Sequence, residues 1–239
     1  MENLLEYTIN AHGGIENWNK FESITARLLC GGVLWDLKQQ SGVMQDIYVT
    51  SNTRKQMTSH YPFINEDWST SFEPGRIAIQ KKNGEIIEEM SAPRDSFSNH
   101  VLETPWTQLQ LAYFAGYAMW TYFNLPFIFK NPDYKVTELE PWNENGELYR
   151  RLEVTFPDEV AAHSGVQTFY IDKEGLIKRH DYNVDISAGA AAAHYLSDYI
   201  EVQGIKIPTK RRVYIRLEDN SVLPEPLLVS IDLSEIVLK

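Results

Sequence analysis

A run of twenty-six residues without a charged side chain, Thr104–Phe129, lies near the middle of this chain. The chain has 239 residues and a formal net charge of −11, so a segment this poor in charge has to be covered on more than one side. Thr104 is a suitable N-cap, Pro105 suits the first helical position, and Pro126 disfavours helix in the residue before it. The sequence therefore predicts a helix over about 105–123.

The predicted helix is apolar on both of its long sides, and such a helix is buried either in a large core or in a membrane. The strictly apolar stretch Leu111–Trp120 covers only half of the roughly 20 residues that a membrane span needs. Gln108 and Gln110 would also be costly in lipid. We therefore expect no membrane span, and we expect the protein itself to cover this helix.

The composition is that of a globular chain that can build a sizeable core, with 43% hydrophobic and 12% aromatic residues. The acidic balance argues against nucleic acid or an anionic membrane surface as a partner. A solvated strand face explains the local group of basic residues, which is Lys206, Lys210, Arg211, Arg212 and Arg216. Cys30 is the single cysteine, so no internal disulfide forms. The first residues lack a basic region followed by an apolar stretch, and we expect a cytoplasmic protein.

Most of the remaining chain has the period-two pattern of β-strands. After short helices at about 2–11 and 15–20, such segments occur near 23–38, 43–60, 76–90, 134–140, 147–156, 165–172, 175–186, 194–203, 205–217 and 226–238. Asn83-Gly84 and Asn145-Gly146 predict type I′ hairpins, Asp172–Gly175 and Gln203-Gly204 predict tight turns, and Ser187–Ala193 predicts a loop or bulge.

Consecutive strands joined by such turns form an antiparallel meander. We therefore predict a single α+β, mainly β, domain over residues 1–239. Its long curved antiparallel sheet is an incomplete barrel with N-terminal helices. The apolar helix at about 105–123 lies across the concave side of that sheet, where one of its sides touches the sheet and the other a cavity, a lid segment or a partner.

Both ends of the chain resemble bacterial proteins of the lipoprotein-localisation-factor (Lol) superfamily, over about half of the sequence. The opening is LLEYTINAHGGIENWNKFESI, and the closing pattern is YIDKEGLIKRHDYNVDI followed by HYLSDYIEVQGIKIPTKRRVYI. The resemblance implies a curved antiparallel half-barrel plugged by helices, with a hydrophobic cavity for acyl chains. Because no export signal is expected, the resemblance does not imply that this protein delivers lipoproteins across a periplasm. Relatives with this architecture include a violacein-pathway enzyme that rearranges an indole-derived intermediate. The resemblance assigns no catalytic residue.

Motifs for common cofactors and hydrolases are absent from the sequence: it has no G-x-G-x-x-G, P-loop, H-E-x-x-H, C-x-x-C or G-x-S-x-G, so we expect no cofactor. In the polar segment 179–185, strand alternation places His180 and Tyr182 on one face. These two residues are candidate acid–base groups. A half-buried His180 that is hydrogen-bonded to a neighbouring strand is the structural alternative.

The next predicted strand adds His194 and Asp198 as candidates on a shared face. They are about 13 Å apart along the strand, so each would pair only with a residue of the adjacent strand. A metal site that combines these histidines with Asp181 and Asp198 has no diagnostic spacing, and we predict none.

Ligand contacts are predicted on the aromatic side of the helix, because Trp and Tyr offer flat apolar area with a polar tip. The candidates are Trp106, Tyr113, Tyr117 and Trp120, together with Arg94 and His100 near the cavity mouth. For the aromatic residues the structural alternative is plain core packing, and for Arg94 it is a surface salt bridge.

Two functions remain open from the sequence. The first is binding of a hydrophobic or aromatic small molecule, lipid-like or from secondary metabolism. The second is a cofactor-independent biosynthetic enzyme for cyclisation, isomerisation or rearrangement, with His, Tyr and Asp as acid–base groups in the same cavity. A third option is an interaction protein, including a homodimer, whose interface is Trp106–Phe129.

Overall fold

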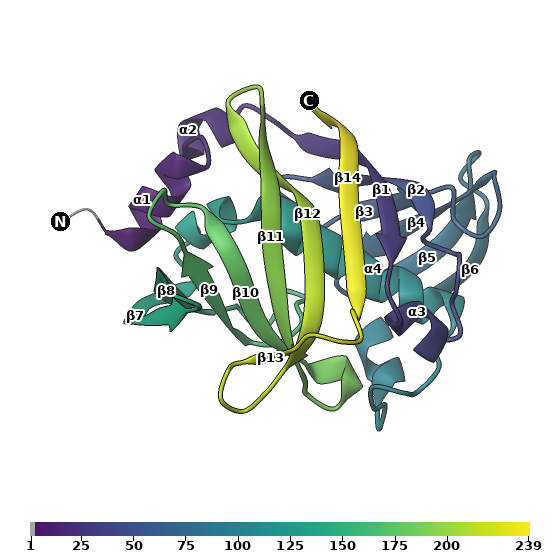
Figure 1. Cartoon of the computed structure of the whole chain (residues 1–239). Coiled ribbons are helices and arrows are strands. Elements are labelled where there is room, and N and C mark those ends of the chain that lie inside the picture. Colours follow the sequence, from purple (N-terminus) through teal and green to yellow (C-terminus); the bar gives the residue numbers. More distant parts are fainter. Residues whose placement is uncertain (1–2) are drawn as a thin grey trace.

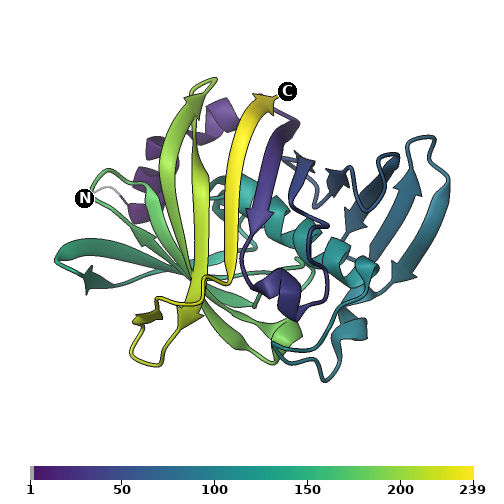
Figure 2. The same cartoon turned by 45° about the vertical axis from the view of Figure 1, so that its right-hand side comes forward.

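An antiparallel sheet curls around the helix α4 (Gln108–Asn124) in the computed structural model, which describes residues 3–239 (Figure 1, Figure 2). The other helical segments are α1 (Leu4–Ala11), α2 (Ile15–Trp18), α3 (Leu34–Leu37), η1 (Pro93–Phe97), η2 (Phe127–Lys130) and η3 (Asp185–Ser187). The strands are β1 (Ser23–Gly31), β2 (Asp46–Asn52), β3 (Thr58–Tyr61), β4 (Trp68–Glu73), β5 (Arg76–Lys81), β6 (Ile86–Ser91), β7 (Lys135–Glu144), β8 (Glu147–Thr155), β9 (Val166–Ile171), β10 (Ile177–Val184), β11 (Ala190–Val202), β12 (Ile205–Arg216), β13 (Val222–Leu223) and β14 (Val229–Leu238).

The strand order is β6-β5-β4-β3-β2-β1-β14-β12-β11-β10-β9-β8-β7, and β13 pairs with β12. The chain builds one half of the sheet from β1 outward to β6. It then crosses through α4 to the far edge at β7, and returns strand by strand to β12. Finally, β14 enters between β12 and β1 and joins the two halves. The sheet does not close into a full barrel, which confirms the predicted fold class.

The hairpins are shaped by residues that tolerate a positive φ angle. Asn145 and Gly146, between β7 and β8, have φ angles of 53° and 89°, as a type I′ turn requires. The turn between β5 and β6 differs from its prediction, because only Gly84 has a positive φ and Lys81 N donates to Glu85 O across a longer loop.

Several predicted strand boundaries are wrong. The first strand ends at Gly31, because Gly32 has a φ of 103° and a Cβ there would lie 2.3 Å from the carbonyl oxygen of Leu228. The chain then forms α3 in place of more strand. Ala190–Ala193, predicted as loop or bulge, belongs to β11. The strand β4 was not predicted, because its sequence WSTSFE has few apolar residues.

Helix α4 begins three residues later than predicted. Its N-cap is Thr107, not Thr104, because Thr107 and Gln110 form a capping box. Gln110 N donates to Thr107 Oγ1 at 3.2 Å, and Thr107 N donates to Gln110 Oε1 at 2.9 Å. At the other end Leu125 is extended, which stops the helix one residue after its predicted end.

Every residue from Leu109 to Asn124 is buried, which confirms that the protein covers α4 on all sides. The option of an exposed interface at this helix is therefore wrong. One side of α4 packs against β2–β5, where Gly116 lets the helix backbone approach Phe72. The opposite side faces the central strands of the sheet. Within residues 3–239, the helices are too short or too polar to cross a membrane.

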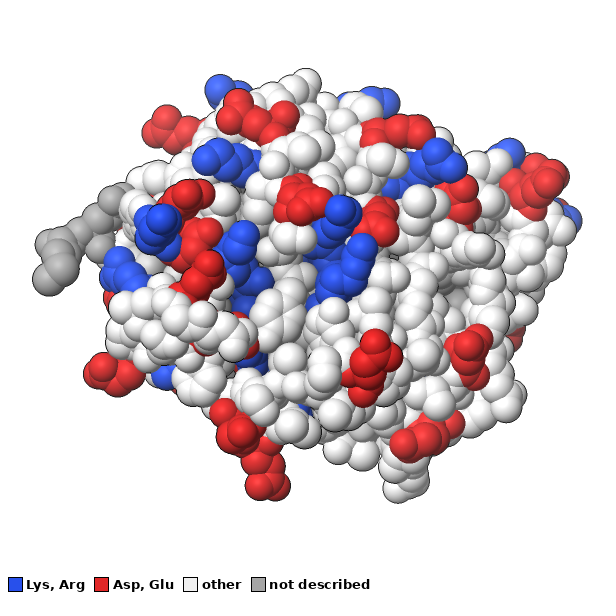
Figure 3. Space-filling view, in the orientation of Figure 1, with Lys and Arg blue, Asp and Glu red and all other residues white. Residues whose placement is uncertain are grey.

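The outer face of the central strands carries interspersed basic and acidic side chains (Figure 3). Surface ion pairs there join Arg212 to Asp232 at 2.7 Å and Lys210 to Asp198 at 2.6 Å. The sheet therefore has a charged outer face, whereas its concave face is mainly apolar, as expected when only one face covers a core.

Replacing Gly116 by alanine should destabilise the fold. The new Cβ would lie 2.4 Å from Phe72 Cγ, so the helix and the sheet would have to separate. We expect the free energy of unfolding to fall by about 1–3 kcal/mol in urea titrations followed by circular dichroism. Gly75→Ala is the matched control, because a Cβ at Gly75 meets no atom within 4 Å. Equal stability of the two variants would contradict the close approach at Gly116.

Candidate functional site

A cavity of about 190 Å³ lies between α4 and the concave face of the sheet. The helix lines it with Phe114, Ala115, Ala118, Met119 and Tyr122. The sheet lines it mainly with Tyr182, Ala192, Val213, Val229 and Ile231. Nearly all of these side chains are apolar, so the cavity suits an apolar molecule.

Small residues on facing elements create this space. In the sheet, Ala192 of β11 pairs with Ile215 of β12 and with Tyr182 of β10. A small side chain therefore lies between two larger ones. Across the cavity, α4 presents Ala115 and Ala118. The half-exposed lining residues are Cys30, Leu102, Val184, Ala190, Ala191 and Ile215. The side chains of Met119 and Tyr122 are buried and close the inner end.

A hydrogen-bonded group of tyrosines around His163 adjoins the cavity, and Tyr122 and Tyr182 of this group line it. The Tyr122 hydroxyl lies 2.8 Å from His163 Nε2 and 3.2 Å from the Tyr182 hydroxyl, and the Tyr117 hydroxyl lies 3.2 Å from His163 Nδ1. The His163 ring stacks on Tyr182 with centroids 4.0 Å apart. Burial lowers the pKa of His163 to about 3 and raises the pKa of Tyr122 to about 12, so both are neutral at physiological pH.

Sequence analysis did not find His163, which lies in the loop between β8 and β9. No periodicity marks this loop, and only tertiary contacts bring His163 against Tyr122 and Tyr182, which line the cavity. A histidine within Ala-Ala-His-Ser-Gly carries no local signal for such a position.

His180 and His194 lie on the concave face, and both are wholly buried. The Nε2 atom of His180 lies 2.5 Å from Gln167 Oε1 on the neighbouring strand β9, which is the type of bond that the structural alternative expected. Neither ring nitrogen of His194 has a partner among the described residues. Burial lowers the pKa of both rings well below the usual value, so both are neutral. Of the candidate acid–base groups, only Tyr182 lines the cavity, and the acid–base roles stay a prediction.

Asp198 does not share the face of His194, contrary to prediction. Its φ angle is 53°, and this interrupts the alternation of β11. Its carboxylate is exposed and pairs with Lys210, whereas the next residue, Tyr199, turns inward and donates its hydroxyl to Ile177 O at 2.6 Å.

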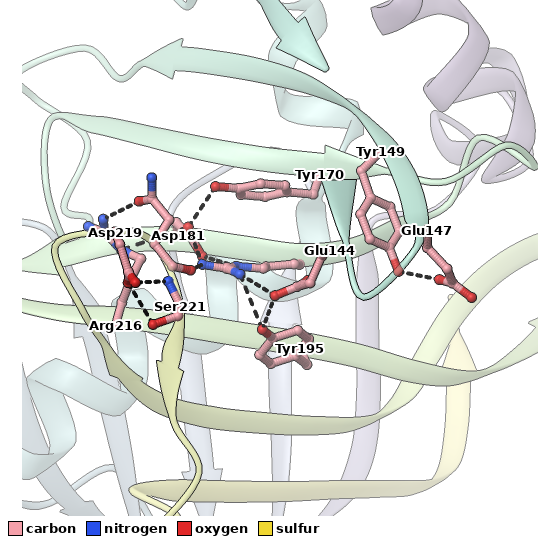
Figure 4. A network of polar contacts seen from close by, with 11 residues as sticks. Glu144, Glu147, Tyr149, Tyr170, Asp181, Tyr195, Arg216, Asp219 and Ser221 are labelled. Carbon is pink, nitrogen blue, oxygen red and sulfur yellow. Dashed lines mark hydrogen bonds and ion pairs between the residues drawn. The ribbon is translucent and has the colours of Figure 1, made fainter. Parts of the chain in front are cut away.

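Asp181 lies on the outer face, where it pairs with the buried Arg179 at 2.7 Å (Figure 4). Arg179 also contacts Glu144 at 2.5 Å, and Tyr170 donates to Asp181 at 2.8 Å. This network fastens β7 and β9 to β10 and has no access to the cavity. In the described part of the chain, His, Cys, Asp and Glu form no group of three or more that could hold a metal ion.

The predicted ligand residues of the helix are divided between its two sides. Trp106 lines the cavity. Tyr113 packs against Phe72 and Tyr117, with ring centroids 5.6 and 5.4 Å apart, respectively. Trp120 lines a separate pocket together with Trp18. Tyr113 and Trp120 therefore point away from the cavity, whereas Trp106 contributes to its lining.

Arg94 and His100 also lie away from the cavity lining. Arg94 donates to Ala162 O at 2.9 Å and forms a half-exposed ion pair with Asp185 at 3.1 Å, the kind of contact that its structural alternative expected. His100 packs edge-on against Phe97, with ring centroids 5.5 Å apart.

The prediction that the basic group near the C-terminus forms a solvated strand face is wrong for Arg211. Its side chain is only 1% exposed and points to the concave side. Its Nη2 donates to Tyr122 O at 2.9 Å, whereas Nε and Nη1 have no partner among residues 3–239. The sequence held a usable signal, because Ile205, Ile207 and Val213 are in phase with Arg211 on the buried face of β12.

The amino-acid sequence matches no protein-family model and no curated protein. Solved structures nevertheless share the fold. A DUF1329 family protein from Desulfovibrio piger has a TM-score of 0.55 and 12% identity, over 100% of this chain and 94% of that one. A LolA superfamily protein from Nitrosomonas europaea has a TM-score of 0.51 and 10% identity, over 94% of this chain and 91% of that one.

A third similar structure is a putative outer membrane lipoprotein-sorting protein domain from Vibrio parahaemolyticus. Its TM-score is 0.53 at 11% identity, over 96% of this chain and 94% of that one. Together these similarities confirm that the chain has the Lol-like half-barrel fold that its two ends resemble.

Buried neutral histidines should make the protein sensitive to acid. Burial lowers the pKa of His60 to about 3, whereas the unfolded chain binds this proton near pH 6.5. The unfolded state thus binds more protons between these values, so stability is lost as pH falls from about 6.5 towards 3. His60→Phe should flatten the dependence of unfolding free energy on pH by up to about 1.4 kcal/mol per pH unit.

Urea titrations between about pH 4 and 7 would measure this slope. His100→Gln is the control, because His100 is only half-buried and should contribute less. A slope unchanged by His60→Phe would show that His60 is protonated equally in both states.

Proposed function

We propose that this protein binds a small hydrophobic molecule in the cavity between α4 and the concave face of the sheet. The observation that carries this proposal is the almost wholly apolar lining of a cavity of about 190 Å³. Ligand sites in proteins are concave and mostly apolar, with a few polar groups that fix orientation. Here the Tyr122, Tyr182 and Ser187 hydroxyls are placed for that task.

The size of the cavity favours a compact ligand. An apolar cavity of roughly 150 Å³ stays dry and binds benzene, so a slightly larger one suits a single aromatic ring or an acyl chain of moderate length. The rings of Trp35, Trp106 and Phe114 in the lining also suit an aromatic ligand.

The fold supports a hydrophobic ligand of this kind. One structure that shares the fold is named for lipoprotein sorting. A lipid-like acyl group is therefore one candidate ligand, and an aromatic secondary metabolite is the other. Localisation in the cytoplasm stays a prediction of the sequence.

Filling the cavity should abolish binding of a hydrophobic probe. We expect the protein to bind 1-octanol at a single site in isothermal titration calorimetry, because burial contributes about 0.8 kcal/mol for each CH₂ group. Ala118→Leu places extra carbon atoms in the cavity and should weaken this binding about tenfold or more. Native mass spectrometry of the freshly purified protein would identify a ligand that is already bound.

Ser234→Leu is the matched control, since it adds the same side chain at an exposed position of β14. It should leave the affinity for 1-octanol unchanged. If Ala118→Leu binds 1-octanol as well as the native protein does, the probe binds outside this cavity and the proposal is wrong.

A further inference from the structure

Arg211 is a buried cation that has no counter-ion within residues 3–239. Arg179, on the opposite face of the same sheet, is equally buried but contacts two carboxylates, those of Asp181 and Glu144. Arg211 forms no ion pair with a carboxylate in the described chain, and its hydrogen bond goes to the carbonyl oxygen of Tyr122. An arginine has five N–H donors, so most of the donors of Arg211 are unused.

Leaving a charge and its donors unpaired inside a protein costs free energy. A buried group of this kind therefore calls for an explanation beyond stability. Arg211 does contact the ring of Tyr122, with its Cζ 4.8 Å from the ring centroid, but this contact leaves Nε and Nη1 without an acceptor.

Arg211 adjoins residues that line the apolar cavity, although its own side chain does not line it. On the concave face its neighbours are Val213, two residues along β12, and Ile231, its partner in β14. Both neighbours line the cavity. The side chain of Tyr122 lies between Arg211 and the cavity, because it lines the cavity and also contacts Arg211 and His194.

Further unused polar atoms lie beside Arg211. Among the residues that the structure describes, both ring nitrogens of His194 lack partners, and so does Nδ1 of His180. The ring centroids of these histidines are 5.8 Å apart, and burial lowers the pKa of both, with a smaller contribution from the charge of Arg211. The remaining titratable groups that interact with Arg211 are Tyr122, Tyr182 and Tyr199, whose phenols are neutral at physiological pH because burial raises their pKa. The net charge of this group is therefore that of a single cation.

We propose that the hydrophobic ligand carries a carboxylate, and that Arg211 binds this carboxylate with His194 donating a second hydrogen bond. This inference rests on the proposed function, since it names the chemistry of the ligand in the same cavity. A monoanion neutralises the single charge of Arg211, whereas a phosphate dianion would leave an excess of negative charge. The apolar part of the ligand lies in the cavity, and the ring of Tyr122 moves aside to admit the head group.

A pair of probes separates this inference from the proposed function. Octanoate and 1-octanol have the same chain length and differ only in the head group, and at about pH 7.5 the acid is ionised. We expect the native protein to bind octanoate at least about tenfold more tightly than 1-octanol in isothermal titration calorimetry, the size of a charge-assisted hydrogen bond.

Arg211→Met should remove this preference and leave the affinity for 1-octanol nearly unchanged. Arg212→Met is the matched control, because it makes the same substitution at the next residue of β12, on the outer face where Arg212 pairs with Asp232. It should keep the preference for octanoate. If Arg211→Met does not fold, Arg211→Lys keeps the charge without the planar guanidinium and should reduce the preference.

The outcomes are distinct. Equal binding of both probes by the native protein overturns the acidic head group while the hydrophobic site stands. A preference for octanoate that survives in Arg211→Met overturns the role of Arg211. Failure of both probes to bind overturns the hydrophobic site and this inference together.

Discussion

The structure depends on the burial of one helix that has no polar side. Helix α4 connects β6 to β7, the two free edges of the sheet, so the chain has to pass through the middle of the half-barrel to build its second half. Because its residues from Leu109 to Asn124 are uncharged, the helix gains free energy from contact on every side, and the curled sheet provides that contact.

The two sides of α4 are packed differently, and this difference produces the cavity. Towards β2–β5 the side chains are large, and Gly116 brings the backbone against Phe72. Towards the central strands the helix presents Ala115 and Ala118, which face Ala192 of β11 across open space. Packing is therefore complete on one side and incomplete on the other. The unpaired donors of Arg211 lie at the border of the incompletely packed side, which is why we connect them to a ligand.

The fold could be predicted to a large extent because its signals are local. Hairpin residues such as Asn145-Gly146 and the alternation in β10 and β12 act over a few residues, and each indicates antiparallel neighbours. The helix was located for the same reason, although its start was placed at Thr104, since a capping box at Thr107 competes with that N-cap. Errors occurred where a single backbone angle changes the alternation, as at Asp198.

The sequence by itself determined that a charge-free helix had to be enclosed by a curved antiparallel sheet, because composition and periodicity fix which surfaces avoid water. Only the tertiary structure decided which side of that helix faces the cavity. It also decided that Arg211 is buried without a carboxylate and that His163 joins Tyr122 and Tyr182. The physical reason is that these contacts join residues that are far apart in the chain. Their geometry depends on how side chains of different size fill the space between the helix and the sheet.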